Sequence, residues 1–367
     1  MRKTYGILGF VMGLAAGAAA QQAPPVALQQ MAVDGRFIDG EGKAPATDIS
    51  GMACMPPRGG RRICLAINDE NRSAQFAAID GDRLVVGQAI ELFGKEPNPK
   101  PLGRPPDIAC SEEGKFKDLD GEGVAYAEPY FYVVGAHGCA RKTGKLHLSS
   151  FLLARVRVDR DGRPVDDDGV PVTADHPQRA VETTWRVSDL LLGAPRVRDF
   201  VARDLKTANG LNIEGIAVHG DTVWFGLRAP VDRGDAFLVR GSLLDLFRKG
   251  HDRAEVLQDA VPLALEGRGV RDLAALPGGR LLVLAGAAEG PEVPFKLFVF
   301  DPATRTLLPV ATLPRVEQKI DGETVLGKAE TVTVLETTPD GTGASVVVLF
   351  DSLIDGLPHR AQIGLPR

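Results

Sequence analysis

The sequence predicts an all-β fold, a β-propeller with five readable blades, and three observations lead to this prediction. Pairs of short apolar runs joined by tight Gly- or Pro-containing turns recur along the chain, as expected for β-hairpins. Each pair is followed by one or two further strand-like runs. Convincing helical periodicity is scarce, the short stretch 243–247 being the best candidate. Repeats of four short strands are typical of propeller blades.

Each of the five predicted hairpins opens with an acidic residue. The second strands return through apolar runs and end near further charged residues, such as Asp69 and Glu70 in the first repeat and Arg228 in the third. The acids that open the hairpins are, in chain order, Asp48, Glu122, Glu214, Asp272 and Glu330.

The last repeat has room for only about one more strand after its hairpin. The run from Ala32 to Ile38 is strand-like, so we expect this N-terminal strand to complete the last blade and to close the ring, which removes exposed edges. Two alternatives remain open at this stage. A degenerate sixth blade could lie within 141–200, or the strands could form a two-sheet sandwich.

The first twenty residues are expected to be a cleaved signal peptide. Arg2 and Lys3 precede an apolar stretch of small residues, and the three alanines at 18–20 fit a signal-peptidase site. Residues 21–44 then form an N-terminal segment that includes the closing strand, and 45–367 form the propeller domain. No later segment approaches the length of a membrane span. We therefore expect a periplasmic or secreted protein without membrane insertion.

The composition argues against nucleic acid as a partner. The formal net charge is −5 at pH 7, whereas phosphate backbones require a basic stripe. No Walker loop, G-x-S-x-G elbow, H-E-x-x-H motif or dinucleotide fingerprint occurs in the sequence. The sequence thus names no catalytic residue, and we expect a monomer that binds a small polar or anionic ligand or a protein partner.

The four cysteines are expected to form two disulfides. Pairing is the default in an oxidising compartment. Cys54 and Cys64 flank a Pro-Pro-Arg-Gly-Gly turn, a spacing that suits a bridge across a hairpin, and this leaves Cys110 with Cys139. A zinc site is a weak alternative because the chain has no C-x-x-C pair.

The charged residues at the hairpin ends predict a binding site. In an antiparallel hairpin the first strand starts where the second ends. If the five hairpins are the innermost pairs of a propeller, their charged ends converge on one mouth of the central channel, a common place for ligands. The predicted mouth residues are Asp48, Asp69, Glu70, Glu122, His137, Glu214, Arg228, Arg271, Asp272, Lys328, Glu330 and Asp351.

Carboxylates that share a narrow space repel one another unless cations intervene. Three interpretations remain open. Arg228, Arg271 and Lys328 could form salt bridges with the acids, or each acid could accept backbone N–H groups where blades meet. The third is a bound hard cation, with Ca²⁺ favoured by oxygen ligands. The candidate metal ligands are Glu122, Glu214 and Glu330.

Several spaced motifs resemble those of domain-of-unknown-function family 3616. They are Leu211 to Pro230, Asp118 to Ala125 with Gly135-Ala136-His137-Gly138, Arg271-Asp272-Leu273, and Lys328-Ala329-Glu330. That family has no established activity. It is more distantly similar to esterase-like phytase propellers and to calcium-binding propellers of the gluconolactonase type, in which Glu followed by Gly opens a blade at the metal site. Glu122-Gly123 and Glu214-Gly215 match that dipeptide, whereas Asp272-Leu273 and Glu330-Thr331 lack the glycine.

Two classes of function follow from these residues. The first is a binding propeller whose mouth holds a small polar or anionic ligand or a partner loop. The alternative is a calcium-assisted hydrolase of phosphoesters or related esters, in which carboxylates hold the ion and Arg228, Arg271 and Lys328 hold the anion. The absence of a recognisable nucleophile favours the binding propeller.

Overall fold

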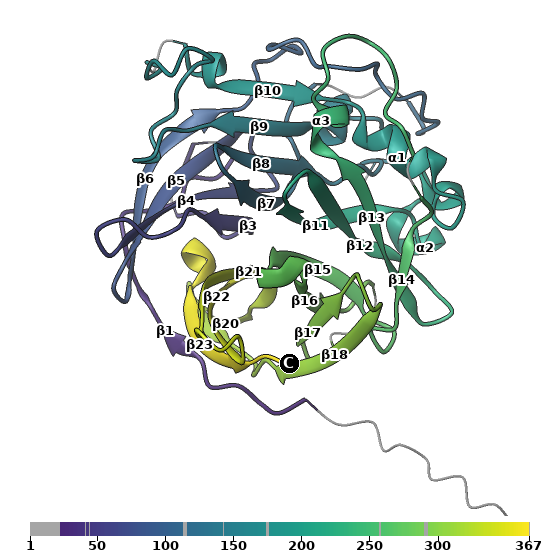
Figure 1. The fold of residues 1–367 in the computed structure, drawn as a ribbon. Coiled ribbons are helices and arrows are strands. Elements are labelled where there is room, and N and C mark those ends of the chain that lie inside the picture. Colours follow the sequence, from purple (N-terminus) through teal and green to yellow (C-terminus); the bar gives the residue numbers. More distant parts are fainter. Residues whose placement is uncertain are drawn as a thin grey trace, which may run out of the picture.

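The computed structural model describes residues 23–40, 42–43, 45–112, 116–141, 143–173, 176–256, 258–289 and 293–366. The expected signal peptide lies outside these residues. Five small sheets stand in a ring and form a five-bladed β-propeller, which confirms the predicted fold class (Figure 1). Within the described ranges, no helix has the length and apolar character needed to cross a membrane.

Each blade has four antiparallel strands, and the first strand of each contacts the first strands of its neighbours around the axis. Blade 1 contains β3 (Ile49–Cys54), β4 (Arg61–Asn68), β5 (Ser73–Asp80) and β6 (Arg83–Glu91). Blade 2 contains β7 (Gly121–Ala127), β8 (Tyr130–Gly135), β9 (Leu153–Arg157) and β10 (Val181–Thr184). Blade 3 contains β11 (Asn212–His219), β12 (Thr222–Asp232), β13 (Asp235–Ser242) and β14 (Val261–Leu263).

Blade 4 contains β15 (Gly269–Ala275), β16 (Leu281–Gly286), β17 (Lys296–Asp301) and β18 (Thr306–Thr312). Blade 5 contains β21 (Lys328–Thr337), β22 (Gly343–Asp351), β23 (His359–Gly364) and the N-terminal β1 (Gln29–Gln30). A separate hairpin, β19 (Glu317–Ile320) and β20 (Glu323–Leu326), lies between the two blades in the sequence. The stretch 141–200 is not a sixth blade, because it supplies β9, β10 and α1 (Val187–Gly193).

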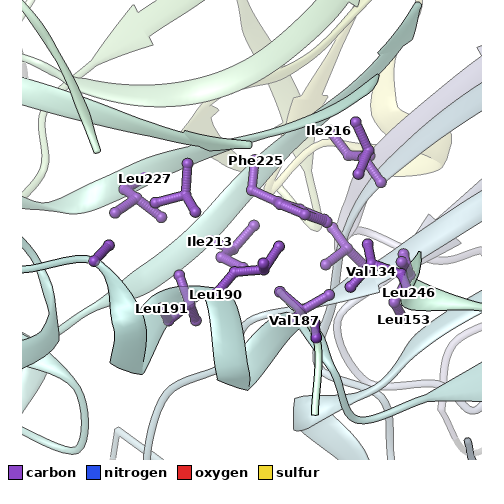
Figure 2. Packing of buried hydrophobic residues seen from close by; sticks show 14 of the residues in the cluster. Val134, Leu153, Val187, Leu190, Leu191, Ile213, Ile216, Phe225, Leu227 and Leu246 are labelled. Carbon is purple, nitrogen blue, oxygen red and sulfur yellow. The ribbon is translucent and has the colours of Figure 1, made fainter. Parts of the chain in front are cut away.

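The helical segments are short. Besides α1, the structure contains α2 (Leu205–Ala208) and α3 (Leu243–Leu246). Single 3₁₀ turns lie at Leu148–Phe151, Pro177–Ala180, Arg198–Phe200, Pro277–Gly279 and Ile354–Gly356. Helix α1 places Val187, Leu190 and Leu191 on one face, the spacing of an amphipathic helix. That face packs into a buried cluster with residues of blades 2 and 3 (Figure 2).

The ring is closed by an N-terminal strand, as expected, but not by the run that we expected. β1 pairs with β23 and completes blade 5, the two strands lying side by side in Figure 1. The run beginning at Ala32 instead supplies β2 (Ala32–Asp34), which pairs in parallel with β6 of blade 1. Met31 and Phe37 are buried in the core between blades 5 and 1. These two buried side chains hold the run beginning at Ala32 against blade 1. β1 could not be predicted from the sequence, because a strand of two residues is too short to show an alternation of apolar and polar side chains.

A β-bulge near the start of each first strand sets the positions around the axis. In all five blades one residue of the first strand is skipped in the pairing with the second. A bulge of this kind re-aims a side chain. The skipped residues, called the ring positions below, are Ser50, Glu122, Glu214, Arg271 and Glu330. Blades 1 and 4 therefore place Ser50 and Arg271, and not Asp48 and Asp272, where the others have Glu.

In blades 1 to 4 the residue after the ring position touches the next blade. A Cβ atom on Gly215 would lie 2.8 Å from the backbone of Asp272, and one on Gly51 would lie 2.8 Å from the Cα of Gly123. A Cβ on Gly123 would lie 3.0 Å from the carbonyl oxygen of Glu214. Glycine thus allows three pairs of neighbouring first strands to approach closely.

The other two junctions use side chains. Asp272 occupies the position of these glycines in blade 4, and its Oδ2 accepts a hydrogen bond of 2.7 Å from the backbone N–H of Val332 in blade 5. Thr333 Oγ1 in turn donates a bond of 2.7 Å to the carbonyl oxygen of Met52 in blade 1. Side-chain hydrogen bonds therefore hold blade 4 to blade 5 and blade 5 to blade 1.

Both predicted disulfides are confirmed. Cys54–Cys64 joins directly paired residues of β3 and β4. Cys110–Cys139 joins the segment that follows β6 to the segment that follows β8. Two disulfides indicate an extracellular or periplasmic protein.

Removal of β1 should destabilise the whole ring. A variant that begins at Met31 lacks β1 and the Pro25–Thr312 bridge, which leaves a blade edge unpaired. Its melting temperature should be at least about 2 °C below that of a variant that begins at Ala23, since roughly 1 kcal/mol produces such a shift in a large domain. Equal melting temperatures would show that β1 does not close the ring.

Gly215→Ala should cost about 1–3 kcal/mol of unfolding free energy, the usual penalty for overpacking. The added methyl group would meet the backbone of blade 4. Gly364→Ala is the matched control, because a Cβ there would meet no atom within 4 Å. Chemical denaturation of both variants measures the difference, and equal stabilities would contradict the close approach of β11 and β15.

Candidate functional site

The ring positions carry a buried group of charges at one mouth of the channel. Glu122, Glu214, Arg271 and Glu330 are 5%, 1%, 3% and 7% exposed. Charges buried to this extent must be paired, protonated or bound to an ion. In the described chain, basic side chains form more ion pairs with these acids on one side of the mouth than on the other.

The side of the mouth formed by blades 3, 4 and 5 is neutralised by two arginines. Arg271 contacts Glu330 and lies 3.5 Å from Glu214, measured from Nη2 to Oε2. Arg228, at the end of the paired region of β12, donates to Glu214 Oε1 at 3.0 Å and to the carbonyl oxygen of Ala288 at 2.7 Å. The carboxylates of Glu214 and Glu330 therefore take part in salt bridges.

The other rim residues of these blades also have partners. Lys328 Nζ lies 3.0 Å from Asp351 Oδ2. Asp272 accepts backbone N–H bonds from Leu273 and Val332, both of 2.7 Å, which is the blade-joining arrangement considered for the acids. These residues are engaged in protein contacts.

The side of the mouth formed by blades 1 and 2 holds an excess of acids. Ile49 pairs with Asn68, which places Asp48 and Asp69 next to each other where β3 starts and β4 ends. Carboxylate oxygens of Asp48, Asp69 and Glu70 all lie within 4.8 Å of one another. We call these three residues together with Asp120 and Glu122 the acidic half.

Several oxygens of the acidic half are buried without a hydrogen bond. Both carboxylate oxygens of Asp48 and Oδ1 of Asp69 are inaccessible to solvent and have no hydrogen-bond partner with good geometry in the described part of the chain. The backbone N–H of Asp48 and the carboxyl group of Asp69 lie near enough to lower the pKa of Asp48, but burial outweighs them. Burial raises the pKa of Asp69 to about 8, with Asp120 and Asp48 adding to the effect. Burial, and next Glu70, raises the pKa of Asp48 to about 6. The protein itself thus stabilises the ionised forms of these acids poorly.

Glu122 and Asp120 extend the acidic half toward the axis. Burial raises the pKa of Glu122 well above its usual range, and the charges of Glu214, Asp120 and Asp69 raise it further. Burial also raises the pKa of Asp120 to about 6, against the opposing effect of Arg141. Within the described ranges, the one ion pair found on the acidic half joins Arg141 Nη2 to Asp69 Oδ2 at 3.7 Å.

A pocket of about 750 Å³ opens beside the acidic half. Asp69, Glu70, Asp118 and Asp120 contribute to its wall, which also carries basic residues that the sequence analysis did not identify. These are Lys117, Arg141, His147 and Lys206. Arg141 follows closely on Cys139, so the Cys110–Cys139 disulfide anchors the segment that carries it. We call this space the mouth pocket.

His137 is fully buried at the end of β8, with 0% exposure. Its Nδ1 donates to the carbonyl oxygen of Gly135 at 2.8 Å, and its Nε2 has no partner among the described residues. Burial lowers the pKa of His137 to about 4. The imidazole is therefore neutral at neutral pH.

Comparisons with known proteins provide a family match. Residues 107–361 match the model of a family described as a protein of unknown function (DUF3616). No curated protein matches the chain.

Solved structures resemble the chain only distantly. Hydrazine synthase from Kuenenia stuttgartiensis is 11% identical at a TM-score of 0.37, over 84% of this chain and 57% of its own. An exo-β-1,3-galactanase from Clostridium thermocellum is 10% identical at a TM-score of 0.40, and the match covers 91% of this chain and 62% of the galactanase chain. The catalytic domain of an α-L-arabinofuranosidase from Coprinopsis cinerea is 10% identical at a TM-score of 0.39, and the match covers 93% of this chain and 98% of that domain. The chain thus spans little more than half of the first two proteins, and their activities do not extend to it.

His137 should make the protein sensitive to acid. Its pKa is about 4 in the folded state and about 6.5 when unfolded, so between these values only the unfolded chain binds the proton. Stability is then lost as the pH falls from 6.5 to 4, by about 3 kcal/mol.

His137→Asn should remove this loss, and Asn tolerates the positive φ of 56° at this position. Unfolding free energies of both proteins between pH 7 and 4 measure the effect. Parallel pH profiles would contradict a neutral, buried imidazole.

Proposed function

We propose a cation-binding function for this chain, which belongs to the family of proteins of unknown function designated DUF3616. The divalent cation, Ca²⁺ by its ligand chemistry, binds to the acidic half of the channel mouth. The observation that carries the proposal is the carboxylate of Asp48, whose two oxygens are buried without a hydrogen bond beside Asp69 and Glu70.

The donor set fits such an ion. Ca²⁺ binds carboxylate and carbonyl oxygens at about 2.3–2.6 Å, so that two oxygens on opposite sides of it are about 5 Å apart. One carboxylate oxygen from each of Asp48, Asp69 and Glu70 lies within 4.8 Å of the other two, so the three can face one ion. Burying ionised carboxylates without partners is costly, and a bound cation offsets that cost.

The proposal assigns different roles to the three glutamates that the sequence suggested as metal ligands. Glu214 and Glu330 already share Arg271, and Glu214 also pairs with Arg228. Glu122, by contrast, is 5% exposed and has no ion pair with a lysine or arginine of the described residues. Glu122 therefore adds negative charge to the cation site, whereas Glu214 and Glu330 hold the blades and their arginines.

A binding function is better supported than hydrolysis. The residues that a phosphoester hydrolase would use to hold its anion, Arg228, Arg271 and Lys328, are engaged by Glu214, Glu330 and Asp351. The mouth pocket, about 750 Å³ in volume, adjoins the acidic half and has the size of a small-molecule site. A bound cation would supply positive charge and open coordination positions to a small polar ligand in this pocket.

Calcium should stabilise the protein through Asp48. At one hundred times its dissociation constant the ion should add about 2.7 kcal/mol to the unfolding free energy. Asp48→Asn should abolish this gain, because the substitution removes a charge from the site. Melting curves recorded with calcium chloride and with a chelator measure the effect.

Glu214→Gln is the matched control, since Glu214 is a ring acid that is already paired with arginine. It should keep the response to calcium even if its own melting temperature is lower. Wild-type curves that coincide with calcium and with chelator would refute the cation site. A response lost in Glu214→Gln and kept in Asp48→Asn would refute the assignment of the acids.

A further inference from the structure

We propose that Arg141 and the divalent cation compete for the acidic half, and that cation binding frees Arg141 to bind an oxyanion in the mouth pocket. This competition rests on the proposed cation site. The cation would thus act as a switch that prepares the pocket for an anionic ligand.

Arg141 lines the mouth pocket and contacts one of the acids. Its guanidinium is 3.7 Å from the carboxylate of Asp69, and its side chain is 41% exposed whereas that of Asp69 is 28% exposed. The same arginine lines the mouth pocket. A rotation of this side chain away from Asp69 would therefore leave the guanidinium in the same pocket, while the Cys110–Cys139 disulfide keeps its segment in place.

In this structure Arg141 is the cation that contacts the acids. Its guanidinium contacts Asp69 and interacts favourably with the charges of Glu122, Asp120 and Glu214, whereas Arg228 repels it. A divalent cation among the same carboxylates would neutralise them and would repel the guanidinium. The contact to be broken is a single one of 3.7 Å and not a bidentate pair, so little holds Arg141 to Asp69.

The buried oxygens favour the ion over the arginine. Arg141 leaves Asp69 Oδ1 and both oxygens of Asp48 without a hydrogen bond. A small ion can reach oxygens that the planar guanidinium does not. The arginine is therefore an incomplete substitute for the cation.

The freed guanidinium determines the class of ligand. Arginine binds carboxylate and phosphate groups through two parallel hydrogen bonds. Lys206 lies in the wall of the same pocket and adds positive charge, whereas Lys117 in that wall is paired with Asp118 at 2.9 Å. The expected ligand is a small molecule with an oxyanion, which is either planar, as a carboxylate is, or tetrahedral, as a phosphate group is.

Calorimetric titration with calcium chloride tests the competition. Arg141→Gln removes the competing charge and should bind calcium about 2- to 10-fold more tightly than the wild type. Arg198→Gln is the control, because Arg198 also forms a single ion pair of 3.7 Å, with Asp199, and does not line the mouth pocket. It should match the wild type within about twofold.

Titration with sodium acetate and with sodium sulfate, each with calcium and with chelator, tests the anion site. The wild type should bind one of the two anions at least about tenfold more tightly with calcium, and Arg141→Gln should lose this gain. A response to acetate alone identifies a carboxylate ligand, and one to sulfate alone identifies a tetrahedral oxyanion.

The two proposals fail in different ways. An absence of calcium binding in every variant overturns the cation site itself. Calcium binding that is unchanged or weaker in Arg141→Gln overturns the competition, although the cation site stands. Calcium-dependent anion binding that survives in Arg141→Gln, or that occurs with neither anion, overturns the role of Arg141 in the pocket.

Discussion

The close approach of the five first strands around the axis is the constraint on which the rest of the structure depends. It requires glycine at three junctions and hydrogen-bonding side chains at the other two, where Asp272 and Thr333 reach the backbone of the next blade. The bulge that precedes each junction places the ring residues in one buried space. The packing of the blades therefore brings charges together, and the charges must then be compensated.

Compensation differs between the two halves of the mouth because of one residue. Blade 4 has Arg271 at the position where blades 2, 3 and 5 have glutamate, and this arginine serves the two glutamates on either side of it, Glu214 and Glu330. Blade 1 has Ser50 at the equivalent position, which brings no positive charge to the neighbouring Glu122. The unbalanced negative charge therefore collects between blades 1 and 2, where Asp48 and Asp69 add to it.

The recurrence of the hairpins was enough to predict the propeller. The spacing of Cys54 and Cys64 predicted the first disulfide, and Cys110–Cys139 followed by elimination. The charged mouth was predictable in outline, because strand ends follow from the hairpins. The β-bulges were not predictable, because which residue is skipped depends on how the two strands pair. The sequence therefore suggested Asp272 for the ring position that Arg271 occupies. Arg141 was missed because a long loop, placed by the Cys110–Cys139 bridge, brings it to the mouth.

The remaining hydrogen-bonding capacity of each arginine separates those that hold the fold from the one that can bind a ligand. The guanidinium of Arg186, 0% exposed, donates to the carbonyl oxygens of five residues between 245 and 252 and needs no carboxylate. Arg271 is occupied by two glutamates, and Arg228 by Glu214 and the carbonyl oxygen of Ala288. A guanidinium has five N–H donors, and Arg141 uses them for one distant contact with Asp69 in the described chain. Its exposed donors, next to carboxylates that an ion would bind better, make Arg141 the arginine of the mouth that can change partners without loss to the fold.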